Sequence, residues 1–341
     1  MQSAVAKPQT DQASPAWPKI LSSYAKPDRG RSLFELAVTI IPFCGLWALA
    51  SVAVYYGWWI GLFLTIPAAG FLLRLFMIQH DCGHRSFFAH RQGDDWTGRA
   101  LGVLTLTPYD YWRRAHAEHH ASTGNLDRRG IGDITTLTIG EYRALSRLGR
   151  LGYRLYRNPL VMFGIGPVWL FLLKQRLPIG MMRDGAEPWV STMATNAAIV
   201  VLAGGLMWAI GPWAFLAVHL PIVILAGAAG IWLFYVQHQF EDTHWDHNAD
   251  WRFQEAALHG SSHYDLPGIL RWLTGNIGVH HVHHLSSRVP CYRLPEVLHD
   301  HPELGGIGRI TLLRSLQCVK LVLWCETRRK LVSFREARVL A

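Results

Sequence analysis

The stretch that decides the fold of this 341-residue chain is WWIGLFLTIPAAGFLLRLFMIQHDCGH, residues 58–84. The part from 58 to 78 contains a single charged residue, Arg74. About 20 such residues are enough for a helix to cross the ~30 Å hydrocarbon core of a bilayer. Two histidines, His80 and His84, follow almost at once. The stretch therefore predicts a membrane-spanning helix that carries two imidazoles to one face of the membrane.

Three further stretches are similarly long and apolar, at residues 34–56, 190–210 and 213–236. Gly57 alone separates the first of them from residue 58, and Gly211 and Pro212 separate the other two. Each pair of stretches must then form a hairpin with almost no loop. Tryptophans lie at both turns, where their rings favour the headgroup level. We expect an all-α integral-membrane fold with four spanning helices in two hairpins.

The positive charges predict the orientation of these helices. Of the 33 lysines and arginines, only Arg74 lies inside a hairpin, and the others lie before residue 34, between 79 and 189, or after 236. The positive-inside rule places those regions, and so both termini, in the cytoplasm. A bacterial inner membrane is the expected location. A shorter apolar segment at 160–173 contains a proline and favours an interfacial or re-entrant helix, because a fifth span would place the regions that follow it on the other side.

The remaining composition narrows the class of protein. Residues 1–30 are polar and contain prolines, without an apolar core before a cleavage site, which predicts a mobile cytoplasmic tail and a single membrane domain over 31–341. The net charge of +9 suits an anionic membrane surface. No cluster of basic and aromatic residues indicates nucleic-acid binding. The five cysteines are scattered, which excludes a thiolate zinc site.

Half of the 18 histidines fall into clusters next to the predicted spans. The clusters read HDCGH, HAEHH, QHQFE and HHVHH, and the histidines concerned are His80, His84, His116, His119, His120, His238, His280, His283 and His284. On a helix, residues i and i+4 project from one face. HxxxH therefore offers both imidazoles to one ion, whereas HxxHH offers its first and last imidazoles to one ion and its middle one to a second ion nearby. The pattern predicts two adjacent metal ions at the cytoplasmic ends of the spans.

The type of ligand favours iron. Zinc, copper, nickel and iron all accept imidazole, but a zinc hydrolase normally shows a carboxylate base as in HExxH, which is absent here. Eight or nine ligands exceed the needs of one zinc ion. Neutral imidazoles leave a high positive charge on the site, which suits iron that holds oxygen-derived anions.

Four segments resemble the histidine boxes and flanks of the integral-membrane fatty acid desaturases. They read HDCGHRSFF, HAEHHASTGNLDRRGIGDITTLT, VQHQFEDTHW and GNIGVHHVHHLSSRVPCYRL. The flanks are similar to those of the bacterial and cyanobacterial acyl-lipid type, and the likeness covers roughly residues 34–300.

This resemblance implies a cytoplasmic helical cap with a di-iron centre, Fe2+ or Fe3+, and O2 as co-substrate. The reaction implied is the removal of two hydrogens from an acyl chain of a membrane lipid, which leaves a cis double bond. Eight ligands carry over from the three boxes by position. One further histidine is implied between the second and third boxes; His238 fits its place best, with His259 and His263 as alternatives.

Two interpretations are open for several other side chains. His281 lies off the predicted metal face and is either a non-ligand or a hydrogen-bond donor behind the ligands. His219 lies inside the fourth span, where a helix–helix hydrogen bond is favoured over a functional role. Carboxylates that accept an N–H from metal-bound imidazoles, or are ordinary surface charges, are Asp81, Glu118, Asp127, Asp133, Glu241 and Asp242. Arg113 and Arg114 are topology charges or lipid-headgroup contacts. Candidate channel-lining residues are Phe87, Phe88, Trp112 and Trp272.

Two electrons per turnover must come from a separate protein. The sequence has no HPGG haem-binding motif, no dinucleotide-binding fingerprint and no iron–sulfur cysteine set, so we expect a donor of the ferredoxin or cytochrome b5 type. A di-iron hydroxylase or carotenoid-type oxygenase has the same histidine pattern and remains an alternative. A metal transporter is a further alternative, but it would place polar ligands near the bilayer midplane, where only His219 is found.

Overall fold

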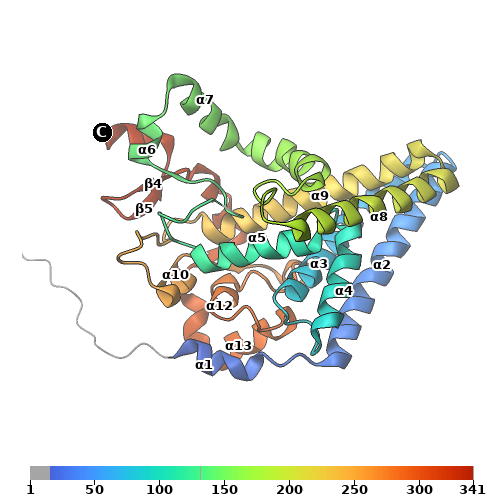
Figure 1. Cartoon of the computed structure of the whole chain (residues 1–341), viewed down its shortest axis with the longest axis horizontal. Helices are drawn as coiled ribbons and strands as arrows, with labels where there is room; N and C mark the ends of the chain where they lie inside the picture. The colour runs from blue at the N-terminus through green and yellow to red at the C-terminus, as the bar shows by residue number, and fades with distance from the viewer. Residues whose placement is uncertain (1–15, 131, 341) are drawn as a thin grey trace, which may run out of the picture.

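The computed structural model describes residues 16–130 and 132–340 and is largely helical (Figure 1). Within these residues, four helices are long and apolar enough to cross a membrane. They are α2 (Arg29–Tyr55), the continuous helix Trp59–Gly83 formed by η2 (Trp59–Leu64) and α3 (Thr65–Gly83), α8 (Ala186–Ile210) and α9 (Pro212–His238). The prediction of an all-α membrane fold with four spanning helices is confirmed.

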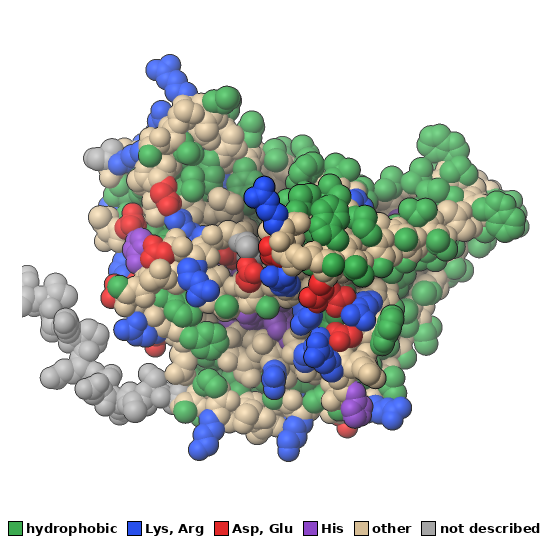
Figure 2. Space-filling model, in the orientation of Figure 1, with side chains coloured by type: hydrophobic (Ala, Val, Ile, Leu, Met, Phe, Trp, Pro, Cys, Tyr) green, Lys and Arg blue, Asp and Glu red, His purple; other side chains and the backbone are tan. Residues whose placement is uncertain are grey.

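Both hairpins turn at a glycine. Gly57 has a φ of +79° and Gly211 a φ of +83°, in the left-handed region that glycine adopts without steric cost. The tryptophans at the turns, Trp58, Trp59 and Trp213, are exposed. Figure 2 shows hydrophobic side chains over this end of the molecule, whereas charged side chains gather at the opposite end. This distribution is the one that a bilayer around the hairpins requires.

The helices extend beyond the predicted spans at the end opposite the hairpin turns. The helix α2 begins at Arg29, where the Asp28 carboxylate accepts the backbone N–H of Arg31 at 2.6 Å and caps the first turn. The helix α3 continues to Gly83, and α9 continues to His238. Apolar composition marks only the part of a helix that lies in lipid, whereas the backbone hydrogen bonds run further. His80 and His238 therefore lie in the last turns of spanning helices.

The segments between α3 and α8, and those after α9, form a cap at this end (Figure 1). Its helices include α4 (Arg91–Leu104), α5 (Tyr109–Ser122), α6 (Ile139–Ala144), α7 (Arg147–Tyr156), α10 (Phe253–His259), α11 (Gly268–Leu273), α12 (His280–Leu285), α13 (Leu294–Asp300), α14 (Leu312–Ser315) and α15 (Phe334–Val339). The cap also contains short strands that the sequence did not predict. Strand β1 (Leu137–Thr138) pairs in parallel with β4 (Leu323–Cys325), which pairs antiparallel with β5 (Lys330–Val332), and β2 (His263–Asp265) pairs in parallel with β3 (Arg309–Thr311).

The apolar segment 160–173 winds mainly as π-helical turns, η3 (Val161–Ile165) and η4 (Val168–Leu173), and it packs along α9. Gly227 of α9 permits the contact, because a Cβ atom there would come within 2.9 Å of the Phe171 ring and 3.0 Å of Pro167. The other side of the segment is exposed. It is not one of the four candidate spans, and its interfacial or re-entrant placement stays a prediction.

The N-terminal region differs from the expected mobile tail. Residues 1–15 lie outside the described part, but α1 (Trp17–Leu21) and the turn after it are folded onto the cap. Trp17, Leu21 and Tyr24 are buried in a cluster with residues of α12 and α13, and the Tyr24 hydroxyl donates to Asp300 Oδ2 at 2.7 Å. The prediction is therefore wrong for residues 16–30. A few large side chains fix this segment, because the burial of each contributes roughly 1.5–3 kcal/mol, and the polar average of the window hides them.

A buried ion pair joins the first two spanning helices. The carboxylate of Glu35, on α2, accepts a hydrogen bond from the guanidinium of Arg74, on α3, and both side chains are almost fully buried. Arg74 also donates to Thr39 Oγ1 at 3.1 Å and to the backbone carbonyl of Trp272 in α11. The single charge inside the second apolar stretch thus connects two spans to the chain segment that leads into the third histidine box.

This ion pair makes a testable prediction about stability. The Glu35→Leu variant leaves the Arg74 cation buried without its carboxylate, which costs about 3–5 kcal/mol in proteins. We expect thermal unfolding in detergent at a clearly lower temperature, and partial recovery in the Glu35→Leu/Arg74→Leu double variant. The matched control is Glu296→Leu, which removes an exposed pair with Arg293 worth no more than about 1 kcal/mol. Equal unfolding temperatures for the two single variants would contradict the prediction.

Candidate metal centre

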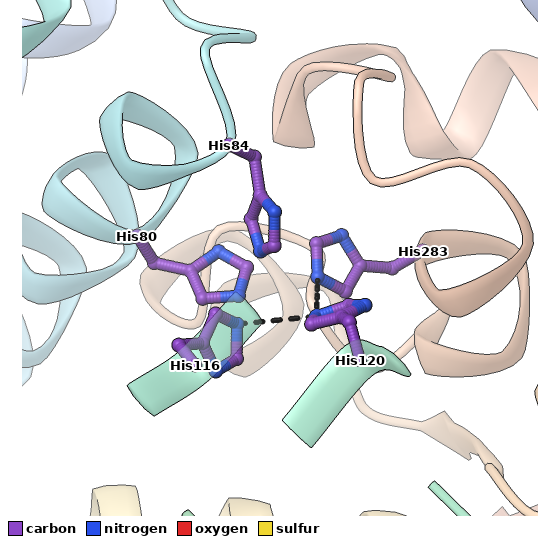
Figure 3. Close-up of side chains that lie close together, drawn as sticks. All are labelled: His80, His84, His116, His120 and His283. Carbon is purple, nitrogen blue, oxygen red and sulfur yellow. Dashed lines mark hydrogen bonds between the residues drawn. The ribbon is translucent and has the colours of Figure 1, made fainter. Parts of the chain in front are cut away.

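Five of the predicted histidines form a first group, drawn in Figure 3. His80 and His84 come from the end of α3, His116 and His120 from α5, and His283 from α12. One ring nitrogen of each lies within 4.8 Å of those of all the others. His120 Nε2 is 3.1 Å from His116 Nε2 and 3.2 Å from His283 Nε2. The rings therefore converge on a common centre.

The other four predicted histidines form a second group with the same spacing limit. Its members are His119 of α5, His238 at the end of α9, and His280 and His284 of α12. His280 Nε2 is 3.0 Å from His238 Nε2 and 3.1 Å from His284 Nε2. All four side chains are buried.

The division between the groups follows the spacing argument. In each HxxHH box, the residues at i and i+4 belong to one group and the middle residue belongs to the other. The groups adjoin, because the His120 ring of the first group stacks on the His284 ring of the second with centroids 4.1 Å apart. All nine histidines predicted from the sequence are thus brought together, in the two sets that their positions on α5 and α12 predict.

The sequence GNIG, residues 275–278, forms the turn that brings the third box to the centre. Gly275 and Asn276 both have positive φ values, +58° and +56°, which turn the chain sharply after α11. The Asn276 side-chain amide donates to the Cys291 carbonyl at 3.0 Å and fixes the turn. At Gly278 a Cβ atom would come within 2.3 Å of the Tyr264 carbonyl oxygen, so only glycine fits. The turn directs α12 toward α5.

The chemistry of the nine side chains fits two metal ions. Burial, with a further contribution from neighbouring imidazoles, lowers the pKa of His84, His116, His120, His280, His283 and His284 well below the usual value of 6.5. These rings are therefore neutral at physiological pH and have a lone pair to offer. Within the described residues, the buried Nε2 atoms of His84 and His119 have no hydrogen-bond partner. Buried polar atoms are costly without a partner, and a metal ion at each centre would satisfy them.

Acceptors behind the rings hold their orientation. Asp133 Oδ1 lies 2.5 Å from His119 Nδ1, the Gly260 carbonyl oxygen lies 3.2 Å from His238 Nδ1, and Asp81 Oδ1 lies 3.4 Å from His80 Nδ1. An acceptor at Nδ1 favours the tautomer whose Nε2 is free to bind a metal. Asp81 also accepts the backbone N–H of Cys291 at 2.7 Å, which ties the first box to the loop after the third.

The other acidic candidates do not have this role. The Asp127 carboxylate lies 2.7 Å from His247 Nδ1, on the surface, and no hydrogen bond among the described residues links Glu118, Glu241 or Asp242 to a histidine of either group.

The histidines outside the two groups do not point into the metal centre. His259 is exposed near Glu255, and His263 Nδ1 donates to the Gly305 carbonyl at 2.7 Å, so neither alternative to His238 reaches the centre. His281 is buried, but its Nε2 donates to the Leu304 carbonyl at 2.9 Å, as expected for a residue off the metal face. His219 stacks on Phe215 and makes no hydrogen bond within the described part of the chain. The prediction of a helix–helix hydrogen bond there is wrong.

Several other candidates have contacts that narrow their roles. Trp112 stacks on His116 with ring centroids 4.6 Å apart, so it supports the first group. Arg114 lies 3.2 Å from Asp184, and Arg113 lies 4.0 Å from Glu187 at the start of α8. The remaining channel candidates pack within the protein: Phe87 and Phe88 against each other, and Trp272 beneath Arg74.

Sequence reasoning missed one buried arginine near the centre. Arg157, just after α7, donates to Gln239 Oε1 at 2.9 Å, to the Tyr235 hydroxyl at 3.1 Å and to the Leu321 carbonyl at 2.8 Å. Gln239 directly follows His238, so this guanidinium fixes the end of α9. No motif surrounds Arg157 in the sequence, and these three partners lie 78 or more residues away.

Comparison with known proteins agrees with this geometry. Residues 56–308 match the family model described as fatty acid desaturase. The chain belongs to the fatty acid desaturase family. It is 48% identical over 320 residues to a fatty acid desaturase of Bacillus subtilis, an alignment that covers 93% of this chain and 90% of the relative.

Two cyanobacterial relatives match more distantly, both from Synechocystis. The sn-1 acyl-lipid omega-3 desaturase (ferredoxin) is 30% identical over 279 residues, 78% of this chain and 73% of the relative. The sn-1 oleoyl-lipid 12-desaturase is 28% identical over 260 residues, 73% of this chain and 71% of the relative. The desaturase described here is thus an enzyme of fatty acyl desaturation, as the resemblance of its histidine boxes implied.

The choice between His238 and its alternatives can be tested by metal analysis. We expect the His238→Ala desaturase to lose metal from the second group, so that its metal content after dialysis against a mild chelator falls from two ions per chain toward one. The His259→Ala and His263→Ala variants should keep the full content. Elemental analysis of the purified proteins measures this directly. A loss in His259→Ala that equals the loss in His238→Ala would contradict the assignment.

The role of Asp133 can be tested in the same way. The Asp133→Asn variant keeps the size of the side chain but removes the negative charge behind His119, so its metal affinity should fall about 10- to 100-fold. Competition with a chelator of known affinity measures the change. Asp242→Asn, which removes an exposed carboxylate, is the control; equal affinities of the two variants would show that Asp133 does not support the centre.

Proposed function

We propose that this desaturase inserts a cis double bond into an acyl chain of a membrane lipid, at a pair of iron ions held by the two histidine groups. One O2 molecule, two electrons and two protons are consumed, the lipid loses two hydrogens, and two water molecules form. The observation that carries the proposal is the convergence of nine imidazoles, in two adjoining groups, at the ends of spanning helices. When bound, the iron ions supply the oxidising power that no side chain has for an unactivated C–H bond.

The protein side chains hold this centre and limit its surroundings. His80, His84, His116, His120 and His283 would bind one ion, and His119, His238, His280 and His284 the other. Asp133 and the Gly260 carbonyl keep two of the rings oriented. The second group is fully buried, which excludes bulk water from that side of the centre.

The position of the centre supports a lipid substrate. His80 lies in the last turn of α3, and α9 ends at His238, so the centre lies at the ends of two spanning helices, next to the bilayer that holds the acyl chains. The names of both Synechocystis relatives specify an sn-1 lipid position. We infer a glycerolipid acyl chain as substrate, with the cap and both termini in the cytoplasm.

The electron donor is inferred to be a separate ferredoxin-type or cytochrome b5-type protein. One relative carries ferredoxin in its name. The first group is closer to the surface than the second, because His84, His116 and His120 are only partly buried. Histidine side chains are visible near the centre of the face in Figure 2, with both basic and acidic side chains around them, and the chain carries a net charge of +9. An acidic donor is steered to such a surface by its charge.

Expression in a host that lacks polyunsaturated lipids tests the proposal. We expect new acyl chains with one additional cis double bond in the glycerolipids, located by mass spectrometry of derivatised fatty acids. The His84→Ala variant should abolish them, whereas His90→Ala, which alters an exposed histidine outside both groups, should not. Hydroxylated acyl chains as the only product would instead support the oxygenase alternative. Stoichiometric zinc without iron in the active protein would exclude the oxidative mechanism.

A further inference from the structure

The helix α7 has one packed side and one exposed apolar side. Toward the protein, Tyr153 is buried and its hydroxyl donates to the Val322 carbonyl at 2.6 Å, and Arg154 donates to the Tyr142 hydroxyl at 2.7 Å. On the opposite side Leu148, Leu151 and Leu155 are 77%, 52% and 53% exposed. Their spacing of three and four residues places them in one row along the helix. Three large apolar side chains in a row are unfavourable in water.

Further exposed apolar side chains follow α7, on a segment that packs along a spanning helix. Leu160, Ile165 and Trp169 are exposed on the turns η3 and η4, which pack along α9. Figure 1 shows α7 at the edge of the molecule and the following turns running from it to α9. Exposed apolar side chains therefore recur along the chain from α7 to the segment that packs on α9.

Two arginines of α7 lie to one side of this row. They are Arg147, which is exposed, and Arg150, which is partly exposed. Neither arginine forms an ion pair within the described part of the chain. Their guanidinium groups are therefore free to bind an anion outside the protein, and phosphate is the anion that a membrane surface presents to such a helix.

We propose that α7 lies in the plane of the membrane interface, with its leucines among the lipid acyl chains and Arg147 and Arg150 on the phosphates of anionic lipids. A short helix with an apolar row and arginines beside it has the composition of an interfacial helix. The occupant is inferred to be lipid, because the chain runs from α7 directly into an exposed apolar segment that packs on the spanning helix α9. This placement concerns the membrane contact of the cap and does not depend on the reaction proposed above.

Fluorescence quenching in vesicles tests the placement. The Cys44→Ser background removes the exposed cysteine, and the other four are buried, so Leu151→Cys can be labelled alone with an environment-sensitive nitrobenzoxadiazole probe. The protein is reconstituted in phosphatidylcholine and phosphatidylglycerol vesicles with nitroxide-labelled lipid. We expect a blue-shifted emission, strong quenching by the nitroxide lipid and little quenching by iodide. The matched control is Glu303→Cys on the opposite side of the cap, which should show the reverse.

Three outcomes would overturn the proposal in whole or in part. Iodide quenching of the Leu151 probe as strong as that of the Glu303 probe would place α7 in water. Protection from both quenchers would show that a protein, a second copy or a partner, covers the row. For the arginines, the Arg147→Glu/Arg150→Glu variant should red-shift the probe in vesicles with phosphatidylglycerol but much less in pure phosphatidylcholine. No difference between these vesicles would refute the contact with anionic lipid.

Discussion

The structure depends on the convergence of nine imidazoles whose nitrogen atoms face one another. Burial lowers the pKa of six of these rings, and pairs of Nε2 atoms approach to 3.0–3.2 Å. Where the Nδ1–H is already donated to an acceptor, as in His119 and His238, the Nε2 atom has only a lone pair to offer, and a cation would satisfy it. Binding of metal and stability of the cap are therefore linked, since a metal that binds only the folded state adds its binding free energy to the stability of that state.

Contacts elsewhere in the molecule hold these rings in place. The Glu35–Arg74 pair joins α2 and α3 and reaches the carbonyl of Trp272, just before the turn that leads to α12. Asp81 binds the loop after the third box, and Arg157 binds the residue after His238. Each of these buried charges joins segments that are far apart in the sequence and ends beside a histidine box. These buried charged groups thus lie where the boxes need to be positioned.

The spanning helices and the grouping of the histidines were predictable, because both depend on local patterns in the sequence. Runs of about 20 apolar residues define the spans, and the positions i and i+4 define which imidazoles share a centre. The features that escaped prediction depend on contacts between distant segments. The strand pairing of Leu137 with Leu323, the contacts of Arg157, and the choice of Asp133 rather than Glu118 behind a ring have no signal in any short window. The packing of Trp17 and Leu21 was missed for the same reason, since the residues of α12 and α13 that they contact lie more than 200 residues away.

The distribution of histidines on α5 and α12 has a consequence for the spacing of the two groups. Each helix gives two imidazoles to one group and one to the other. The separation between the groups is then fixed mainly by the positions of the residues along these two helices and less by the loops between them. A tilt of either helix would displace both groups together, so two ions held there would move as a pair. Such a centre would keep its internal spacing even while the surrounding lipid fluctuates.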